Sequence, residues 1–185
     1  MPKLNYTIFL AAMMGITSCE KMVEVEDPID SITTNQVFST DDQASAAMAG
    51  VYSKMINDVS GIGSAQGQFS SGLATVVGGC SADELTIPDQ TYFGDPYAFF
   101  VTNKLLRDNN LVPNIWNSAY TTIYNANAII EGIAASTSAR LTEAVRKKLT
   151  AESKFVRAFS YFYLVNFFGD VPLVMTVDFN KTRYL

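Results

Sequence analysis

The chain has 185 residues, 48% of them hydrophobic and 12% aromatic, a composition typical of one globular domain. Its formal net charge of −5 argues against a nucleic-acid partner, because contact with phosphate backbones needs clustered Lys and Arg. The sequence contains no histidine, which removes the commonest general base and the commonest transition-metal ligand. We therefore expect no enzyme, no cofactor and no metal site.

The first 19 residues have the layout of an export signal. Lys3 supplies a positive start, residues 6–14 are largely apolar, and small residues follow. This stretch is too short for a permanent membrane span, which needs ~20 residues, but it suits a secretory signal peptide. The letters ITSC, ending at Cys19, resemble the bacterial lipobox, whose cysteine is acylated, as with palmitate, and becomes the mature first residue. We predict a leader over 1–18 and a lipid on Cys19; the alternative is an ordinary signal peptide with a chance cysteine.

An acidic segment, residues 19–39, follows the predicted lipid site. From Glu20 to Asp42, seven side chains are acidic and only Lys21 is basic. Such a segment buries little and predicts a solvated tether. It also loosely resembles the surface-export signals of Bacteroidetes lipoproteins, and both interpretations stay open. With Cys19 acylated, Cys80 has no partner for a disulfide, and without a histidine to activate its thiol we expect it to be inert.

Apolar periodicity next predicts helices, so the expected fold class is mostly α. Residues 39–42 offer a helix N-cap and first-turn acids. The apolar residues behind them recur at spacings of three and four, as on one helix face: Ala44, Ala47, Met48, Val51, Tyr52 and Met55. Residues 58–114 are glycine-rich at first and predict a long irregular loop. Loops of this length in compact domains are usually functional or disordered, so we expect any ligand contacts there.

Two longer helices complete the predicted scaffold. One follows Pro113, and the other begins at Thr142 and ends at Phe168, before Gly169 and an extended piece over 173–177. From residue 155 onward, apolar side chains occupy all sides of the second helix, as in a helix buried among others. The inner stripe of the first helix comprises Trp116, Ala119, Tyr120, Ile123, Asn127, Ile130 and Ala134.

These helices resemble the N-terminal part of the SusD/RagB family of Bacteroidetes nutrient-binding lipoproteins. WNSAYTTIYNANAIIEGI matches the family's Trp–Tyr–Ile–Ala–Asn helix, and AESKFVRAFSYFYLVNFFGDVPLV matches a second helix that ends in Gly-Asp-x-Pro-Leu-Val. The earlier GVYSKM is a further match, while Ser153 and Val156 stand where the family usually has alanine and leucine. The matching positions in the two long stretches include Trp116, Tyr120, Ile123, Ala126, Asn127, Glu152, Phe155, Arg157, Ala158, Tyr161, Leu164, Gly169, Asp170, Pro172, Leu173 and Val174.

The resemblance implies a fold in which tetratricopeptide-like helix pairs form a scaffold. It implies a binding protein that is lipid-anchored in the outer membrane and exposed at the cell surface. The implied partners are a TonB-dependent, SusC-like transporter and an oligosaccharide or, in some branches, a peptide. The alternative function is a helical-repeat protein-interaction module without a ligand site of its own.

Members of this family are longer than this chain, so we expect residues 40–185 to be an incomplete N-terminal helical domain. Helical repeats bury their apolar faces on neighbouring repeats. A helix as apolar as residues 155–168 therefore needs partners beyond three helices. We expect the chain on its own to be marginally stable or to associate.

Glycan binding needs flat aromatic faces beside amide and carboxylate groups. The candidate ligand-binding residues in the long connection are Tyr92, Phe93, Tyr97, Asp95 and Asn103, beside Asp89 and Gln90. Structural packing is the alternative role for each of them. Asp83, Glu84 and Asp89 offer oxygens suited to Ca²⁺, but their spacing fits no EF-hand loop.

A second set of positions is expected to be structural. Glu152 and Arg157 lie five residues apart, a poor spacing for pairing on one helix. We expect each to bond a neighbouring helix or loop carbonyls, with Asp170 as a partner for a basic side chain. The full structural set is Trp116, Asn127, Glu152, Arg157, Gly169, Asp170 and Pro172.

Overall fold

The computed structural model describes residues 34–57, 68–87 and 96–183. The chain divides into a unit over 1–33 and a unit over 34–185. The predicted leader, Cys19 and most of the predicted tether belong to the first unit, which lies outside the described residues. The described part of the second unit is mostly helical and contains no β-strand, which confirms the expected fold class.

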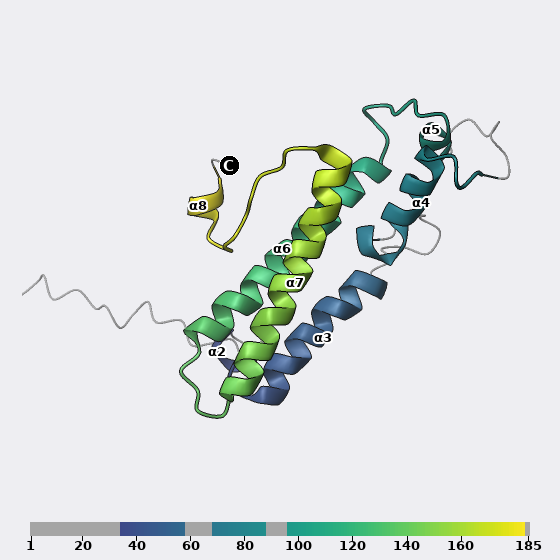
Figure 1. Cartoon of the computed structure of the whole chain (residues 1–185). Helices are drawn as coiled ribbons and strands as arrows, with labels where there is room; N and C mark the ends of the chain where they lie inside the picture. The colour runs from purple at the N-terminus through teal and green to yellow at the C-terminus, as the bar shows by residue number, and fades with distance from the viewer. Residues whose placement is uncertain (1–33, 58–67, 88–95, 184–185) are drawn as a thin grey trace, which may run out of the picture. The chain divides into compact units, whose positions relative to one another are not determined.

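Two long helices form the frame of this unit. α6 spans Leu111–Ala135 and α7 spans Glu143–Phe168, and the two lie side by side (Figure 1). α6 begins two residues before Pro113, because proline is tolerated in the first turn of a helix. The limits predicted for α7 are confirmed: the Thr142 side chain accepts from Val145 N, and Gly169 ends the helix with a φ of 76°.

Shorter helices pack onto this pair. α3 (Asp41–Asn57) contacts both long helices, and α2 (Thr34–Val37) precedes it at the end of the predicted tether. The remaining elements are a 3₁₀ turn, η3 (Phe69–Ser71), and the helices α4 (Leu73–Ser81), α5 (Ala98–Val101) and α8 (Phe179–Thr182).

The connection over 58–114 differs from the irregular loop predicted for it. Its described part contains η3, α4 and α5. Phe69, Leu73, Val77 and Cys80 from this stretch are buried against the long helices. Their burial offsets the low helix propensity of Gly78 and Gly79, which had obscured α4 in the sequence.

The core consists of two hydrophobic clusters that share α6 and α7. The first cluster lies against α3, and the second lies against η3, α4 and α5. The first contains Phe38, Ala44, Met48, Val51, Ala126, Ile129, Ile133, Leu141, Leu149 and Val156. The second contains Phe69, Leu73, Val77, Cys80, Phe100, Leu111, Ile115, Ala119, Ile123 and Leu164.

α7 is not buried on all sides, so that interpretation of its apolar pattern is wrong for the described chain. Phe155, Phe162 and Val165 are 69%, 63% and 52% exposed. The cause is geometric: among the described elements, α6, α3 and η3 pack on α7, and the side chains of Phe155, Phe162 and Val165 stay exposed. The sequence pattern shows that α7 carries apolar side chains on all sides, but it does not show how many helices pack around α7.

Polar contacts fix the end of the frame where α7 begins. The Asp41 carboxylate accepts from Thr142 N at 2.6 Å and from Thr142 Oγ1 at 2.9 Å, which joins the start of α3 to the start of α7. The Arg146 guanidinium donates to the carbonyls of Ile133, Ser138 and Leu141. These bonds satisfy carbonyls at the end of α6 and in the connecting loop, which have no helical partner.

Replacing glycine by alanine should have opposite effects on the free energy of unfolding at positions 132 and 50. A methyl group at Gly132 would overlap the buried Phe38 ring, so Gly132→Ala should lower the free energy of unfolding by about 1–3 kcal/mol. Gly50 lies on an exposed side of α3 with open space around it, so Gly50→Ala should raise that free energy by up to about 1 kcal/mol. Urea unfolding of both variants measures this, and a stabilising Gly132→Ala would contradict the packing described here.

Candidate functional site

The segment 169–177, called the strap below, leaves α7 in an extended conformation and runs along the α6–α7 pair (Figure 1). Gly169 makes the turn with a positive φ, which an L side chain adopts only with strain. Successive strap residues bond successive positions of α6: Pro172 O bonds Tyr120, Val174 O bonds Asn127, and Val177 N bonds Glu131.

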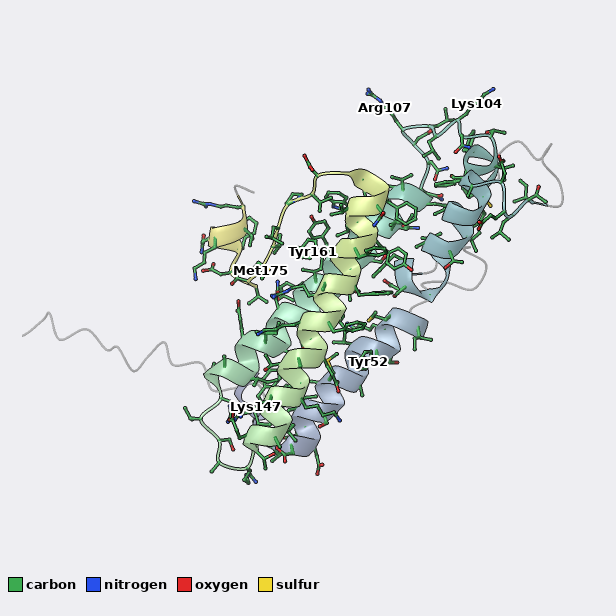
Figure 2. All side chains as sticks on the ribbon, in the orientation of Figure 1. Tyr52, Lys104, Arg107, Lys147, Tyr161 and Met175 are labelled. Carbon is green, nitrogen blue, oxygen red and sulfur yellow. The ribbon has the colours of Figure 1, made fainter. Side chains whose placement is uncertain are left out.

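Two tyrosine hydroxyls bind the first half of the strap. Tyr120 Oη donates to Pro172 O at 2.8 Å. Tyr161 Oη accepts from Val174 N at 2.6 Å and lies 3.1 Å from Val174 O, to which it donates. The Tyr161 ring, labelled in Figure 2, stands edge-on to the Tyr120 ring with centroids 6.4 Å apart. The strap is therefore bonded to both long helices over its central residues.

A buried amide joins α6, α7 and the strap. Asn127 is fully buried on α6; its Nδ2 donates to Val174 O at 3.1 Å, and its Oδ1 accepts from Arg157 Nη1 of α7 at 2.7 Å. A charge-assisted bond of this kind is stronger than a neutral one. Burial of the phenol raises the pKa of Tyr161, although the hydrogen bond with the Val174 backbone and the positive charge of Arg157 both act to lower it.

Burial also raises the pKa of the neighbouring Tyr120 to about 12, and the nearby Tyr161 adds to the shift. Both hydroxyls therefore stay protonated and remain hydrogen-bond donors at neutral pH. The hydroxyls of both residues bond the strap, and Tyr120 also lines the outer face of α6.

The outer face of α6 carries a shallow hollow with a volume of about 440 Å³. Three aromatic residues line it at intervals of four positions, together with an amide and a hydroxyl: Trp116, Tyr120 and Tyr124 with Asn117 and Thr121. Trp116 is held from behind by the Phe168 ring, edge-on at 5.0 Å, and by the Tyr120 ring at 4.9 Å. The hollow thus combines fixed aromatic rings with uncharged hydrogen-bonding groups.

A second hollow lies on α7, with a volume of about 320 Å³. Its lining is mostly charged and includes Glu143, Arg146, Lys147 and Lys154. It has no aromatic wall. The two hollows therefore differ in the chemistry they offer.

Comparison with known proteins identifies the family. Residues 80–184 match the model of a SusD-like family described as starch-binding and associating with the outer membrane. The chain belongs to this SusD-like family. The resemblance predicted from the two helical motifs is thereby confirmed.

Three curated SusD-like proteins are similar to the chain. SusD-like proteins P25 and P2 of Formosa agariphila are 27% and 28% identical to it over 172 and 175 residues, which is 91% and 93% of this chain. A SusD-like protein of Bacteroides ovatus is 30% identical over 78 residues, 42% of this chain and 14% of the relative. The chain spans about a third of the Formosa relatives, 31% and 30% of their lengths. No solved structure matches the chain.

Of the ligand-binding residues predicted for this SusD-like protein, only Tyr97 and Asn103 lie within the described part of the chain. Tyr92, Phe93 and Asp95, with Asp89 and Gln90, lie outside the described residues. Tyr97 is half-buried and packs against the second core cluster. Asn103 has a φ of 52° and donates to Ser81 O at 3.1 Å, so its side chain closes a loop. The predicted cluster stays a prediction.

Glu152 and Arg157 both have side-chain contacts outside α7. Glu152 accepts from Tyr52 Oη of α3 at 3.5 Å, and Arg157 bonds Asn127 of α6, so each reaches a neighbouring helix. Asp170 differs from the expectation: among the described residues, no ion pair includes it. Asp170 lies just after the turn at Gly169 and is exposed.

The hollow on α6 and the bonds from tyrosines to the strap were not predicted from the sequence. Trp116 and Tyr120 were assigned to an inner stripe, yet they also reach the outer face. Aromatic residues at 116, 120 and 124 repeat every four positions, and this spacing was the available signal. The strap bonds gave no such signal, because backbone carbonyls of an extended segment leave no pattern in the sequence.

Within residues 34–57, 68–87 and 96–183, no cluster of three or more His, Cys, Asp or Glu residues is arranged to hold a metal ion. Among the helices that the structure describes, none combines the length and the apolar character needed to cross a membrane.

The raised pKa of Tyr120 predicts a loss of stability at alkaline pH. Below pH 10 the phenol is protonated in both states; above it, the unfolded chain ionises first, so the free energy of unfolding should fall as pH rises from 10 to about 12. Tyr120→Phe should flatten this decline, because it removes the titrating group. Urea unfolding across this pH range measures the slope. Tyr124→Phe, which changes an exposed phenol on the same helix, is the control, and equal slopes in all three proteins would contradict the prediction.

Proposed function

We propose that this protein binds a glycan as a lipid-anchored component of an outer-membrane nutrient-uptake system. The observation that carries the proposal is the match of residues 80–184 to a family described as starch-binding and associating with the outer membrane. That description names a polysaccharide, which favours an oligosaccharide over a peptide as the ligand. The role is capture of the ligand and not its chemical conversion.

The geometry supports a binding role. Sugar rings are held by flat aromatic faces together with side chains that bond their hydroxyl groups. The described chain offers aromatic side chains on a frame stiffened by the strap, whose carbonyls and amide are bonded by Tyr120, Asn127 and Tyr161. A stiff frame favours binding because fewer side chains have to be ordered when the ligand arrives.

Attachment and partnership form the finer part of the proposal. A lipid on Cys19 would hold the protein at the outer membrane, and the acidic segment 19–39 would let it reach away from the surface. The partner is a TonB-dependent transporter, to which the captured glycan passes. The protein then faces the outside of the cell, where polysaccharides are found.

A helical interaction module is the second candidate, and one observation favours it. Phe155, Phe162 and Val165 form an exposed apolar row on α7. Exposed apolar patches commonly mark contacts with other proteins. Contact through α7 and glycan binding elsewhere are compatible, so this candidate competes with the first only if no glycan binds.

The proposal predicts retention by a polysaccharide. The full chain, produced in a Bacteroides host and purified in a non-glycosidic detergent, should migrate more slowly through gels containing amylopectin than through plain gels. It should also fractionate with the outer membrane, incorporate a palmitate analogue and co-purify with a TonB-dependent transporter.

Matched cysteine variants separate the parts of this test. Cys19→Ser should lose the lipid label and the membrane fraction, while Cys80→Ser, at a buried cysteine, should keep both. The folded chain is run through gels that contain amylopectin, xylan, laminarin or dextran. If none of these polysaccharides slows its migration, the glycan-binding function is overturned.

A further inference from the structure

The aromatic row on the outer face of α6 has the dimensions of a sugar-binding platform. Trp116, Tyr120 and Tyr124 are spaced four residues apart, and four residues advance a helix by about 6 Å. This step is comparable to the length of one pyranose unit. The hollow that they line, about 440 Å³, falls within the range of about 300–1,000 Å³ that small ligands occupy.

Two of the three rings are fixed before any ligand arrives. Trp116 is packed against Phe168 and Tyr120, and Tyr120 is bonded through its hydroxyl to Pro172 O of the strap. Ligand binding therefore does not have to order these side chains, which preserves affinity. The strap thus holds Tyr120 through its hydroxyl, while Tyr124 stays exposed.

The third ring is placed to contact a ligand. Tyr124 is 55% exposed, and it belongs to neither core cluster, so the packing of the described residues does not account for its position. A single exposed tyrosine is ordinary. Here it continues a row of two fixed rings, Trp116 and Tyr120, which are tilted 43° to each other.

The polar lining selects the class of ligand. Asn117 offers an amide donor and acceptor, and Thr121 offers a hydroxyl, both at the edge of the aromatic row. Charged side chains are absent from this lining, in contrast to the hollow on α7 with Glu143 and Lys147. Uncharged groups beside aromatic faces suit the hydroxyls and C–H faces of a neutral sugar.

We propose that this hollow binds a pyranose unit of a neutral glycan. The C–H face of this unit stacks on Tyr124, another unit of the same glycan chain lies over Trp116, about 12 Å along α6, and Asn117 and Thr121 bond sugar hydroxyls between them. The inference rests on the proposed function and assigns it a site on α6. Because the hollow is shallow and lined by one helix, the contact is weak for one unit and gains from several units of a chain.

The chain provides its own reporter for this site, since Trp116 is the only tryptophan in the sequence. The full chain in non-glycosidic detergent is titrated with maltoheptaose while the tryptophan emission is recorded. Saturable change in emission is expected. Tyr124→Ala should weaken binding by about tenfold, and Asn117→Ala should weaken it severalfold. Phe162→Ala, at an exposed aromatic on α7, should leave the titration unchanged.

The outcomes separate this site from the function itself. If amylopectin retards the chain but maltoheptaose leaves Trp116 emission unchanged and Tyr124→Ala still binds, the α6 site is wrong and the glycan-binding function stands. If another polysaccharide retards the chain, its hexasaccharide replaces maltoheptaose in the same titration, with the same criteria. If no polysaccharide retards the chain and no oligosaccharide changes the emission, both proposals fail. Equal circular dichroism and urea midpoints for Tyr124→Ala and the unmodified chain exclude misfolding as the cause of lost binding.

Discussion

The Asn127 amide bonds three parts of the molecule at one buried point. It lies on α6, accepts from Arg157 of α7 and donates to Val174 O of the strap. A buried amide left without partners would cost about 1–3 kcal/mol, so the arrangement that satisfies it is strongly preferred. The register of the strap on the helix pair follows from this bond. Once Val174 is placed, its own N–H reaches Tyr161 Oη, and the carbonyl of Pro172 comes within reach of Tyr120 Oη.

The strap also contacts Tyr120, which lines the hollow on the outer face of α6. One side of this helix supplies Ile115, Ala119 and Ile123 to the core, and the side next to the strap carries Tyr120. Because the strap holds the Tyr120 hydroxyl, the Tyr120 ring supports Trp116, which Phe168 contacts edge-on. A structural contact and a candidate ligand surface therefore share the same residues. For this reason Trp116 and Tyr120, which match the family's helical motif in sequence, also line the hollow.

The sequence predicted those features that local chemistry determines. Thr142 and Gly169 have distinct capping chemistry, so the limits of α7 followed from residue type. The spacing of Glu152 and Arg157, five residues apart on one helix, likewise argued from local geometry against a pair between them. Features that depend on distant packing were not predictable in this way. α4 forms despite two glycines because the core buries its apolar side, and Phe155 is exposed because too few described helices surround α7. Of the candidate ligand-binding residues, Asn103 bonds Ser81 O, a contact between residues 22 positions apart that periodicity does not reveal.

The most direct test of this account is a double-mutant cycle between Asn127 and Arg157. Urea unfolding is measured for the full chain, for Asn127→Leu, for Arg157→Met and for the double variant, with hydrogen exchange of the Val174 amide followed in each. The account predicts a coupling energy of about 0.5–3 kcal/mol between the two sites and faster exchange at Val174 in both single variants. Additive effects within about 0.3–0.5 kcal/mol, with unchanged protection of Val174, would contradict the claim that this contact holds the strap to the helix pair.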